Sequence, residues 1–258
     1  MKTGFRTAGF AAWELGPTLE EIRLIGYDSV ELCLEHPGSL PGMMNEVRIR
    51  RVAKMLEEIE LALSSVSYHG DGSAPEDRER KLLAAVDIAR GLGASVLVMN
   101  AGAKDPARPD DDAVAAARLG GLLEKAEKHG IDVAVEPEPG LLIGSSADFE
   151  RVARKLGSPR LKLNLDVGHA YLTDPDVAQT IRRLAGSIVH THIEDIAGRV
   201  HKHLLPGEGE MDLRAIIAAL RDSGFGGYLT IDLFDLGPEP GERARQALQA
   251  LQAVGVPD

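Results

Sequence analysis

The chain has 258 residues and a formal net charge of −11 at pH 7, with hydrophobic and charged fractions of 44% and 27% that are ordinary for a globular protein. The acidic balance argues against a protein that coats a phosphate backbone, because such proteins present a basic face. A single cysteine, Cys33, excludes an intrachain disulfide and a four-thiolate zinc site. We therefore expect no nucleic-acid partner and a reducing compartment.

The hydropathy pattern contains no run of roughly 18 apolar residues, the length that a membrane span requires. The apolar run near the N-terminus is interrupted by Gly9 and closed by Glu14, so it is too short for a signal peptide. The expectation is a cytoplasmic protein without a membrane partner.

Short β-rich runs alternate with longer helical patterns along the whole chain. Strands are predicted at residues 4–10, 28–34, 60–67, 94–100, 131–136, 161–167, 188–193 and 228–234. Helices are predicted between and after them at residues 18–24, 46–58, 76–92, 111–128, 146–156, 174–184, 212–223 and 242–254. This alternation predicts a single (β/α)₈ barrel domain over residues 1–258. The rival is a doubly wound open sheet, but its glycine-rich dinucleotide turn is missing, since the Gly-Leu-Gly at 91–93 follows a helix.

Polar side chains share one face near the C-terminal ends of four predicted strands. In Leu-Lys-Leu-Asn-Leu-Asp at 161–166, the leucines alternate with polar residues, and residues 131–136, 188–192 and 228–232 show a similar division. A barrel strand packs its apolar face against the helices, so the other face points toward the axis. We expect four side chains to converge at the rim where barrel enzymes carry their active sites: Glu136, Asp166, His192 and Asp232.

Buried carboxylates at close range raise each other's pKa unless a cation lies between them. The predicted cluster combines three carboxylates with one imidazole, a donor set that suits a hard or borderline divalent ion. The sequence therefore predicts one divalent metal ion, with Mn²⁺, Mg²⁺, Co²⁺ and Zn²⁺ all left open.

The segments that carry these residues resemble the xylose isomerase-like barrel superfamily, which includes sugar isomerases, ketose 3-epimerases, inosose and dehydroshikimate dehydratases, and endonuclease IV. The matching segments are VAVEP at 133–137, LNLDVGH at 163–169, VHTHIED at 189–195, LPGEGEMD at 205–212 and GYLTID at 227–232. In that superfamily a Glu, an Asp, a His and a Glu from the last four strands hold the metal. The resemblance implies that Glu136, Asp166 and His192 do so here. Asp232 departs from the pattern, because it is one methylene shorter than the expected glutamate.

Further polar residues lie near the predicted rim. The resemblance implies that His169, in the loop after Asp166, contacts substrate or a second metal ion. The long loop after residue 193 contains His201 and His203, which we predict to grip a substrate hydroxyl or phosphate, or to form a second metal site; the alternative is a mobile loop with surface histidines. Glu35 and His69 follow the second and third predicted strands and are candidates for substrate contact or for ordinary packing.

Two residues beside His192 have open roles. His190 lies one layer deeper on the same strand face, where a hydrogen-bonded core histidine and a functional one are both open. Asp195 is a candidate for orienting His192 or the adjacent loop, with a solvated carboxylate as the alternative.

The leading hypothesis is a metal-dependent isomerase or epimerase of a small polyhydroxylated carbonyl compound, acting through an enediolate. Glu136 is the predicted general base, and Asp232 returns the proton from the other side. The runner-up is a lyase or dehydratase on the same scaffold, with His201 or His203 as the acid, or an enzyme that cleaves a keto-glycoside. A non-catalytic binding barrel is the alternative of another class. Related barrels are often dimers or tetramers, so a homo-oligomer is also open.

Overall fold

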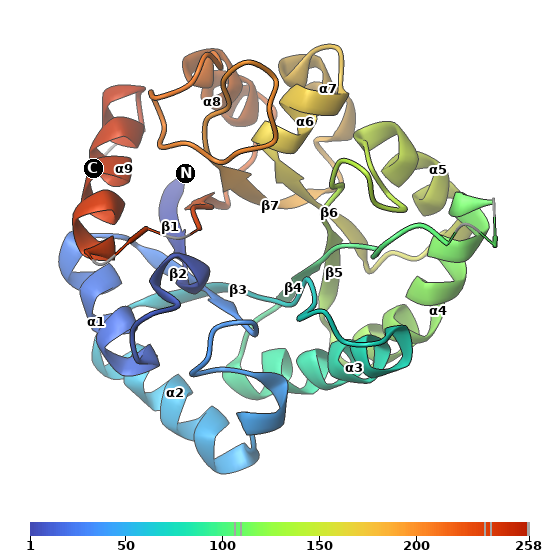
Figure 1. The fold of residues 1–258 in the computed structure, drawn as a ribbon, viewed down its shortest axis with the longest axis horizontal. Coiled ribbons are helices and arrows are strands. Elements are labelled where there is room, and N and C mark those ends of the chain that lie inside the picture. Colours follow the sequence, from blue (N-terminus) through green and yellow to red (C-terminus); the bar gives the residue numbers. More distant parts are fainter. Residues whose placement is uncertain (106, 109, 235, 238, 257–258) are drawn as a thin grey trace.

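Parallel strands form the centre of the molecule (Figure 1). The computed structural model of the protein describes residues 1–105, 107–108, 110–234, 236–237 and 239–256. The strands pair in chain order and β8 closes the sheet against β1, so the predicted (β/α)₈ barrel is confirmed. The strands are β1 (Lys2–Arg6), β2 (Ser29–Cys33), β3 (Ala62–Ser67), β4 (Val96–Met99), β5 (Asp132–Val135), β6 (Leu161–Asp166), β7 (Ile188–Ile193) and β8 (Tyr228–Ile231).

Helices surround the strands as an outer ring (Figure 1). They are α1 (Leu15–Ile25), α2 (Glu46–Glu58), α3 (Pro75–Leu92), α4 (Asp111–His129), α5 (Ser146–Leu156), α6 (Val167–Thr173), α7 (Val177–Leu184), α8 (Leu213–Asp222) and α9 (Pro240–Ala253). Short 3₁₀ turns, η1 (Thr7–Phe10) and η2 (Pro41–Met43), lie in the first two βα loops. Within the described residues, none of the helices has both the length and the apolar character of a membrane-spanning segment.

Capping residues explain where the helices begin and end. A side chain just before the first helical residue accepts a backbone N–H from the first turn, which contributes about 0.5–2 kcal/mol per cap. The capping residues of this kind are Asn45, Asp110, Ser145, Asp166, Asp176 and Asp212. Glycines in the left-handed conformation end four helices: Gly26, Gly93, Gly130 and Gly157.

Several predicted boundaries differ from those in the structure, and three of them have a bearing on the site or a clear local cause. The first strand ends at Arg6 rather than at residue 10, because the chain turns into η1 and packs Phe10 edge-on against Phe5, with ring centroids 5.5 Å apart. The last strand ends at Ile231 rather than at residue 234. The helix predicted from residue 174 begins at Val177, since Asp176 provides its cap while Asp174 accepts a hydrogen bond from Thr180.

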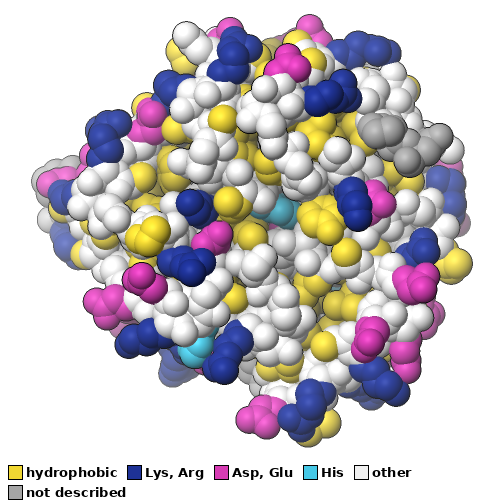
Figure 2. Space-filling view, turned by 180° about the vertical axis from the view of Figure 1, so that it is seen from behind, with side chains coloured by type: hydrophobic (Ala, Val, Ile, Leu, Met, Phe, Trp, Pro, Cys, Tyr) yellow, Lys and Arg dark blue, Asp and Glu magenta, His cyan; other side chains and the backbone are white. Residues whose placement is uncertain are grey.

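The main apolar core lies between the barrel and the surrounding helices. Inside the barrel, Val96, Val98 and Ala134 form a second, small apolar cluster, against which Val189 packs. The rest of the interior is polar and becomes more so toward the C-terminal ends of the strands, where the side chains of the candidate site lie. The face opposite to that in Figure 1 shows side chains of both charges interspersed around its periphery (Figure 2).

Candidate active site

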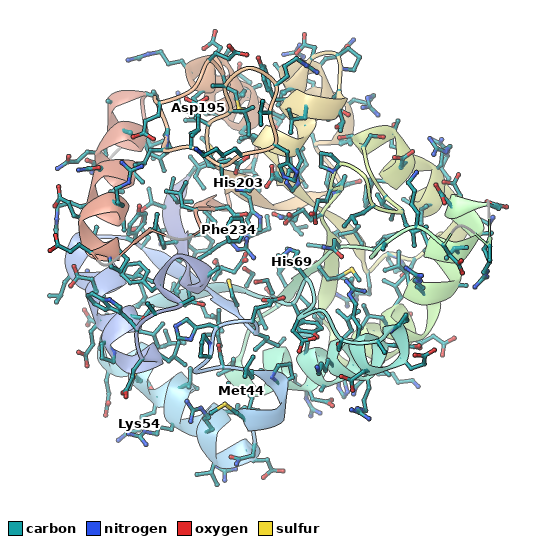
Figure 3. The ribbon with its side chains drawn as sticks, viewed as in Figure 1. Met44, Lys54, His69, Asp195, His203 and Phe234 are labelled. Carbon is teal, nitrogen blue, oxygen red and sulfur yellow. The ribbon has the colours of Figure 1, made fainter. Side chains whose placement is uncertain are left out.

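A cavity of about 850 Å³ opens at the C-terminal rim of the barrel. Its walls come from loops that are far apart in sequence, and they include Arg6, Glu35, His69, Glu136, His203 and Asp232. Figure 3 shows His69, His203 and Phe234 around the middle of the barrel, whereas Lys54 lies on the outer side of α2. The cavity is the place at which the sequence predicts catalytic chemistry.

The four predicted metal ligands meet at the floor of this cavity. Ligand atoms of Glu136, Asp166, His192 and Asp232 all lie within 4.8 Å of one another, and all four residues are buried. His192 Nδ1 is 2.8 Å from Glu136 Oε2, 3.4 Å from Asp232 Oδ2 and 4.0 Å from Asp166 Oδ2. The structure therefore brings together the four residues that the alternation of polar and apolar residues along the strands predicted to meet at the rim. We call them the carboxylate centre.

Among the described residues, two buried oxygens of the carboxylate centre, Asp166 Oδ2 and Asp232 Oδ2, have no hydrogen bond from a permanently protonated donor, although the neighbouring acid Glu194 can donate to Asp166 when it is protonated. An ionised oxygen without a partner in a dry interior is costly, so such atoms are rarely left unpaired. Both oxygens lie on the side of their carboxylates that faces His192 Nδ1. The donor set of three carboxylates and one imidazole fits a divalent cation.

Glu31 on β2 holds His192 in the orientation that this centre needs. Glu31 Oε2 lies 3.0 Å from His192 Nε2 and accepts its proton, which leaves Nδ1 as the nitrogen directed at the three carboxylates. Metal-binding histidines commonly donate their second nitrogen to a carboxylate in this way. Burial alone would raise the pKa of Glu31, but the charges of His192 and Arg6 hold that pKa well below its ordinary value. Glu31 is therefore ionised at neutral pH.

His190 lies deeper in the barrel. Its Nε2 is 2.9 Å from Glu31 Oε2 and 3.3 Å from Ser65 Oγ, and burial lowers the pKa of the imidazole. The side chain is a hydrogen-bonded part of the interior and is not among the residues that line the cavity.

Arg6, at the end of β1, was not predicted as a site residue. Its guanidinium donates to Asp232 Oδ1 at 2.6 Å, to Glu31 Oε1 at 2.7 Å and to His69 Nδ1 at 3.2 Å. The positively charged guanidinium of Arg6 thus bridges two buried carboxylates and a histidine. The sequence does offer one indication of this role, because an arginine within a strand predicted to be buried needs a charged partner.

Glu136 is held by two hydrogen-bond donors. Asn164 Nδ2 lies 2.6 Å from Glu136 Oε2. His69 Nδ1 accepts from Arg6, so the proton of this ring is on Nε2, which lies 3.2 Å from Glu136 Oε2. Both donors reach the same oxygen, and Glu136 Oε1 is left nearer to His169, at 3.6 Å from Nδ1. His69 thus contacts a predicted catalytic residue as well as the cavity.

His169 lies in the short helix α6 and not in a loop as expected, because Asp166 caps that helix by accepting from the His169 N–H. Its buried ring reaches the cavity beside His201 and His203 from the β7–α8 loop. Glu35 also lines the cavity, but its Oε1 accepts the backbone N–H groups of His69 and Gly70. Glu35 therefore fastens the loop after β3.

Asp195 fixes the loop that carries His201 and His203. Its Oδ2 accepts from Gly207 N at 2.9 Å and from Gly209 N at 3.0 Å. Its Oδ1 accepts from the N–H groups of Ile196 and Met211. The sequence left open whether Asp195 orients His192 or the adjacent loop, and in the structure it orients the loop. The loop is therefore tied at both ends, and its histidines are presented by an ordered backbone.

Glu194 is a buried acid that sequence reasoning missed. Burial, followed by the neighbouring charge of Asp166, raises the pKa of Glu194 well above its ordinary value. Its Oε1 accepts from Gly168 N at 2.6 Å, and a Cβ at position 168 would collide with this oxygen, so glycine is required there. No sequence pattern distinguishes Glu194 from a rim carboxylate facing solvent.

Comparisons with known proteins identify the family of the chain. A family model described as xylose isomerase-like TIM barrel matches residues 19–254. Fructoselysine 3-epimerase of Shigella flexneri is 25% identical over 270 residues, covering 98% of each protein. An inosose dehydratase of Lacticaseibacillus casei is 22% identical over 248 residues, covering 83% of this chain and 80% of the relative.

Among solved structures, that of the IolI protein with a binding zinc atom superposes with a TM-score of 0.81 at 18% identity and covers 98% of each chain. This likeness concerns the fold. The family model spans nearly the whole barrel, including every member of the carboxylate centre. The chain belongs to the xylose isomerase-like TIM barrel family.

Proposed function

We propose that this protein is a divalent-metal-dependent isomerase or epimerase of a small polyhydroxylated carbonyl compound. The observation that carries the proposal is the carboxylate centre, in which three buried carboxylates and one imidazole converge at the floor of an open cavity. The epimerase among the relatives supports the same class of reaction. A divalent cation held by Glu136, Asp166, His192 and Asp232 supplies Lewis acidity, which makes a C–H next to a carbonyl easier to deprotonate.

The residues of the chain divide the remaining tasks. Glu136 accepts the proton from the substrate carbon, since its carboxylate reaches the cavity and is oriented by Asn164 and His69. Asp232, directly after β8, lines the cavity and would return a proton to the carbon. Burial favours the neutral acid, but Arg6 and His192 lower the pKa of Asp232, so this proton is taken up from solvent, and Glu136 releases the proton that it removed to solvent. Arg6 keeps Asp232 in place by holding its other oxygen. The imidazoles of His169, His201 and His203 line the same cavity, and their ring nitrogens can form hydrogen bonds with substrate hydroxyls.

The test is Glu136→Gln, assayed with keto-sugars and keto-inositols. Loss of a general base lowers kcat by about 10²–10⁴-fold. The metal content of this variant is measured alongside, because a normal content separates loss of the base from loss of the cation. Glu127→Gln makes the same change on the exposed surface of α4 and serves as the matched control. Full activity in Glu136→Gln would end the proposal.

A lyase is the second candidate, favoured by the inosose dehydratase among the relatives and by the imidazoles of His201 and His203 in the cavity. The proton is removed in the same way, and a histidine then protonates a leaving β-hydroxyl group as water. Mass spectrometry of the product distinguishes the two candidates, because dehydration changes the mass of the substrate and isomerisation does not.

The carboxylate centre itself is tested by elemental analysis of the purified protein beside Asp166→Ala. We expect roughly one divalent ion per chain at this centre in the wild type and its loss in the variant. A carboxylate centre that takes up neither Mn²⁺, Co²⁺ nor Zn²⁺ would favour the non-catalytic binding barrel.

A further inference from the structure

Glu194 lies immediately after β7 and is completely buried, yet it is not among the described residues that line the cavity. A buried carboxyl group is costly and is found where its oxygens have specific partners. The partner of Glu194 is the start of α6, the helix that follows Asp166 in the chain. This contact ties the end of β7 to the helix that begins at the end of β6.

Two carboxyl groups accept backbone N–H groups from the first turn of α6. Glu194 Oε1 accepts from Gly168 N at 2.6 Å, and Asp166 Oδ1 accepts from His169 N at 2.6 Å. The first four N–H groups of a helix have no partner within the helix, so acceptors from outside help to decide where it begins. Because α6 has only 7 residues, its own hydrogen bonds contribute little to fixing its position.

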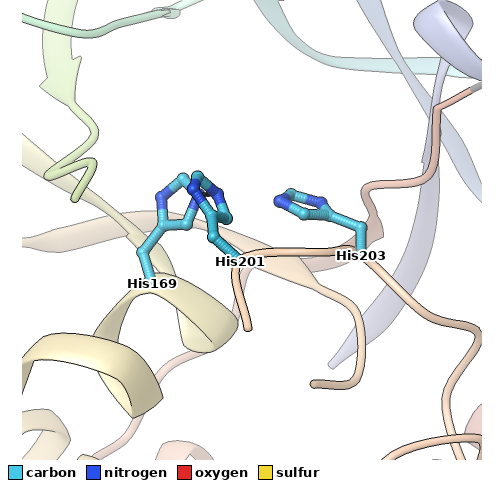
Figure 4. Close-up of side chains that lie close together, drawn as sticks. All are labelled: His169, His201 and His203. Atoms are coloured by element: carbon cyan, nitrogen blue, oxygen red, sulfur yellow. Dashed lines mark hydrogen bonds between the residues drawn. The ribbon is translucent and has the colours of Figure 1, made fainter. Parts of the chain in front are cut away.

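The position of α6 bears directly on Asp166. This side chain uses Oδ1 for the helix and directs Oδ2 at the carboxylate centre, 4.0 Å from His192 Nδ1. A shift of the first turn of α6 would therefore turn Oδ2 away from the other ligands. The same helix carries His169, whose ring points toward the other two histidines of the cavity wall (Figure 4). Glu194 can thus orient a ligand and a cavity histidine without lining the cavity itself.

Gly168 shows how closely Glu194 approaches α6. A Cβ atom at position 168 would collide with Glu194 Oε1 and would lie 3.0 Å from Glu194 Cδ and 3.1 Å from Ile196 Cγ1. Gly168 is not one of the described glycines with a positive φ, so its backbone conformation is open to other residues. Glycine is needed at this position for space, and Glu194 occupies most of that space.

We propose that Glu194 is a positioning residue, which fixes the first turn of α6 and thereby orients Asp166 and His169 at the site. The inference rests on the proposed function in one respect, since it takes the carboxylate centre as the place where a divalent ion binds. The task requires an acceptor oxygen, and a glutamine offers one at the same reach. A leucine has a similar volume and offers none. These two substitutions therefore separate the hydrogen bond from the filling of space.

Cation affinity is measured by titrating Mn²⁺ against a competing chelator. We expect Glu194→Leu to weaken binding by about 10–100-fold, the usual effect of losing a group that orients a metal ligand. Glu194→Gln should keep most of the affinity, whereas leucine would serve as well as glutamine if Glu194 only filled space. Glu124→Leu and Glu124→Gln, on the exposed surface of α4, are the matched controls and should bind Mn²⁺ as the wild type does.

A second measurement needs no cation. Hydrogen exchange of the Gly168 and His169 amides is followed by NMR in the metal-free proteins. Both amides should be protected in the wild type and in Glu194→Gln. The Gly168 amide should lose its protection in Glu194→Leu, because its acceptor is gone. Circular dichroism verifies that each variant is folded.

Urea denaturation of the metal-free proteins tests the contact from the side of the glycine. Gly168→Ala should destabilise the protein, because the new Cβ meets the carboxyl group. In a Glu194→Ala background the same change should cost clearly less, because two of the three atoms nearest to the Cβ are then absent. Additive losses of unfolding free energy would show that the two positions do not interact.

The outcomes separate this inference from the proposed function. If a folded Glu194→Leu binds Mn²⁺ as the wild type does, the positioning role is wrong. It is equally wrong if Glu194→Gln loses as much affinity as Glu194→Leu. If the wild type itself takes up no divalent ion, the proposed function fails, and the exchange of the Gly168 amide then decides whether Glu194 fixes α6.

Discussion

Arg6 Nη1 lies 2.6 Å from Asp232 Oδ1, and both side chains are almost completely buried. The same guanidinium pairs with Glu31, so one arginine compensates two carboxylates inside the barrel. Asp232 therefore has one oxygen committed to Arg6 and one directed at the other ligands of the carboxylate centre.

This relationship predicts strong coupling between the two positions. Arg6→Gln leaves two buried carboxylates without their cation, and Asp232→Asn removes one of them. We expect the Arg6→Gln variant to lose about 3–5 kcal/mol of unfolding free energy, the usual cost of breaking a buried pair. The double variant should lose clearly less than the sum of the single losses. Urea denaturation of the metal-free wild type, the two single variants and the double variant measures these losses of unfolding free energy. Additive losses would contradict the coupling.

Glu31 is predicted to act on cation affinity without being a ligand of the carboxylate centre. Glu31→Gln keeps the shape of the side chain but weakens its acceptance of the His192 Nε2 proton. Loss of such a partner typically lowers metal affinity by about 10–100-fold. Titration with Mn²⁺ against a competing chelator measures this change. Glu57→Gln, on the exposed side of α2, provides the matched control. Unchanged affinity in Glu31→Gln would show that His192 does not depend on this acceptor.

Asp148 gives a prediction about stability and pH that is separate from the metal. Its carboxylate accepts from Gly144 N at 3.0 Å and from Ser145 Oγ at 2.9 Å, and it pairs with Arg151. Burial opposes ionisation, but the hydrogen bonds from Arg151, Ser145 and Gly144 lower the pKa of Asp148 below its ordinary value. A lowered pKa in the folded state means that the stabilisation is present above the unfolded value, about 3.9, and is lost as the pH falls through the folded value.

We therefore expect Asp148→Asn to reduce the unfolding free energy by about 0.5–1 kcal/mol at pH 7, a small effect because the pair with Arg151 is partly exposed. The difference from the wild type should shrink below pH 4 and vanish in stronger acid. Chemical denaturation across the pH range measures it. A constant difference at all pH values would show that charge is not its origin.

The sequence was sufficient for the barrel and for the carboxylate centre because both depend on local periodicity. Alternating β and α segments close in chain order, and the period of two along a strand assigns Asp166 and His192 to the interior. Contacts across the barrel are different. Glu31 on β2 meets His192 on β7 because of the width of the barrel and the stagger of its strands, and no spacing along the chain encodes these.

Arg6 was missed for a related reason. A strand predicted to run to residue 10 makes position 6 an interior residue of the strand, whereas the real strand ends there and delivers the guanidinium to the rim. Similarly, α6 is a single short helix whose start depends on Asp166 acting as both a rim carboxylate and a helix cap. Helices this short carry too few residues for a periodic signal.

The clamp formed by Asp195 bears on how this barrel could acquire new substrates. Four backbone N–H groups converge on one carboxylate, and they come from residues just after β7 and just before α8. The stretch between these ties, which includes Val200 and Lys202, is mostly exposed and contributes few side chains to the core. Substitutions there reshape the wall of the cavity while the strands below keep their register. Selectivity in this protein is thus separable from foldability, and directed evolution confined to residues 198–206 should change the preferred substrate with little loss of thermal stability.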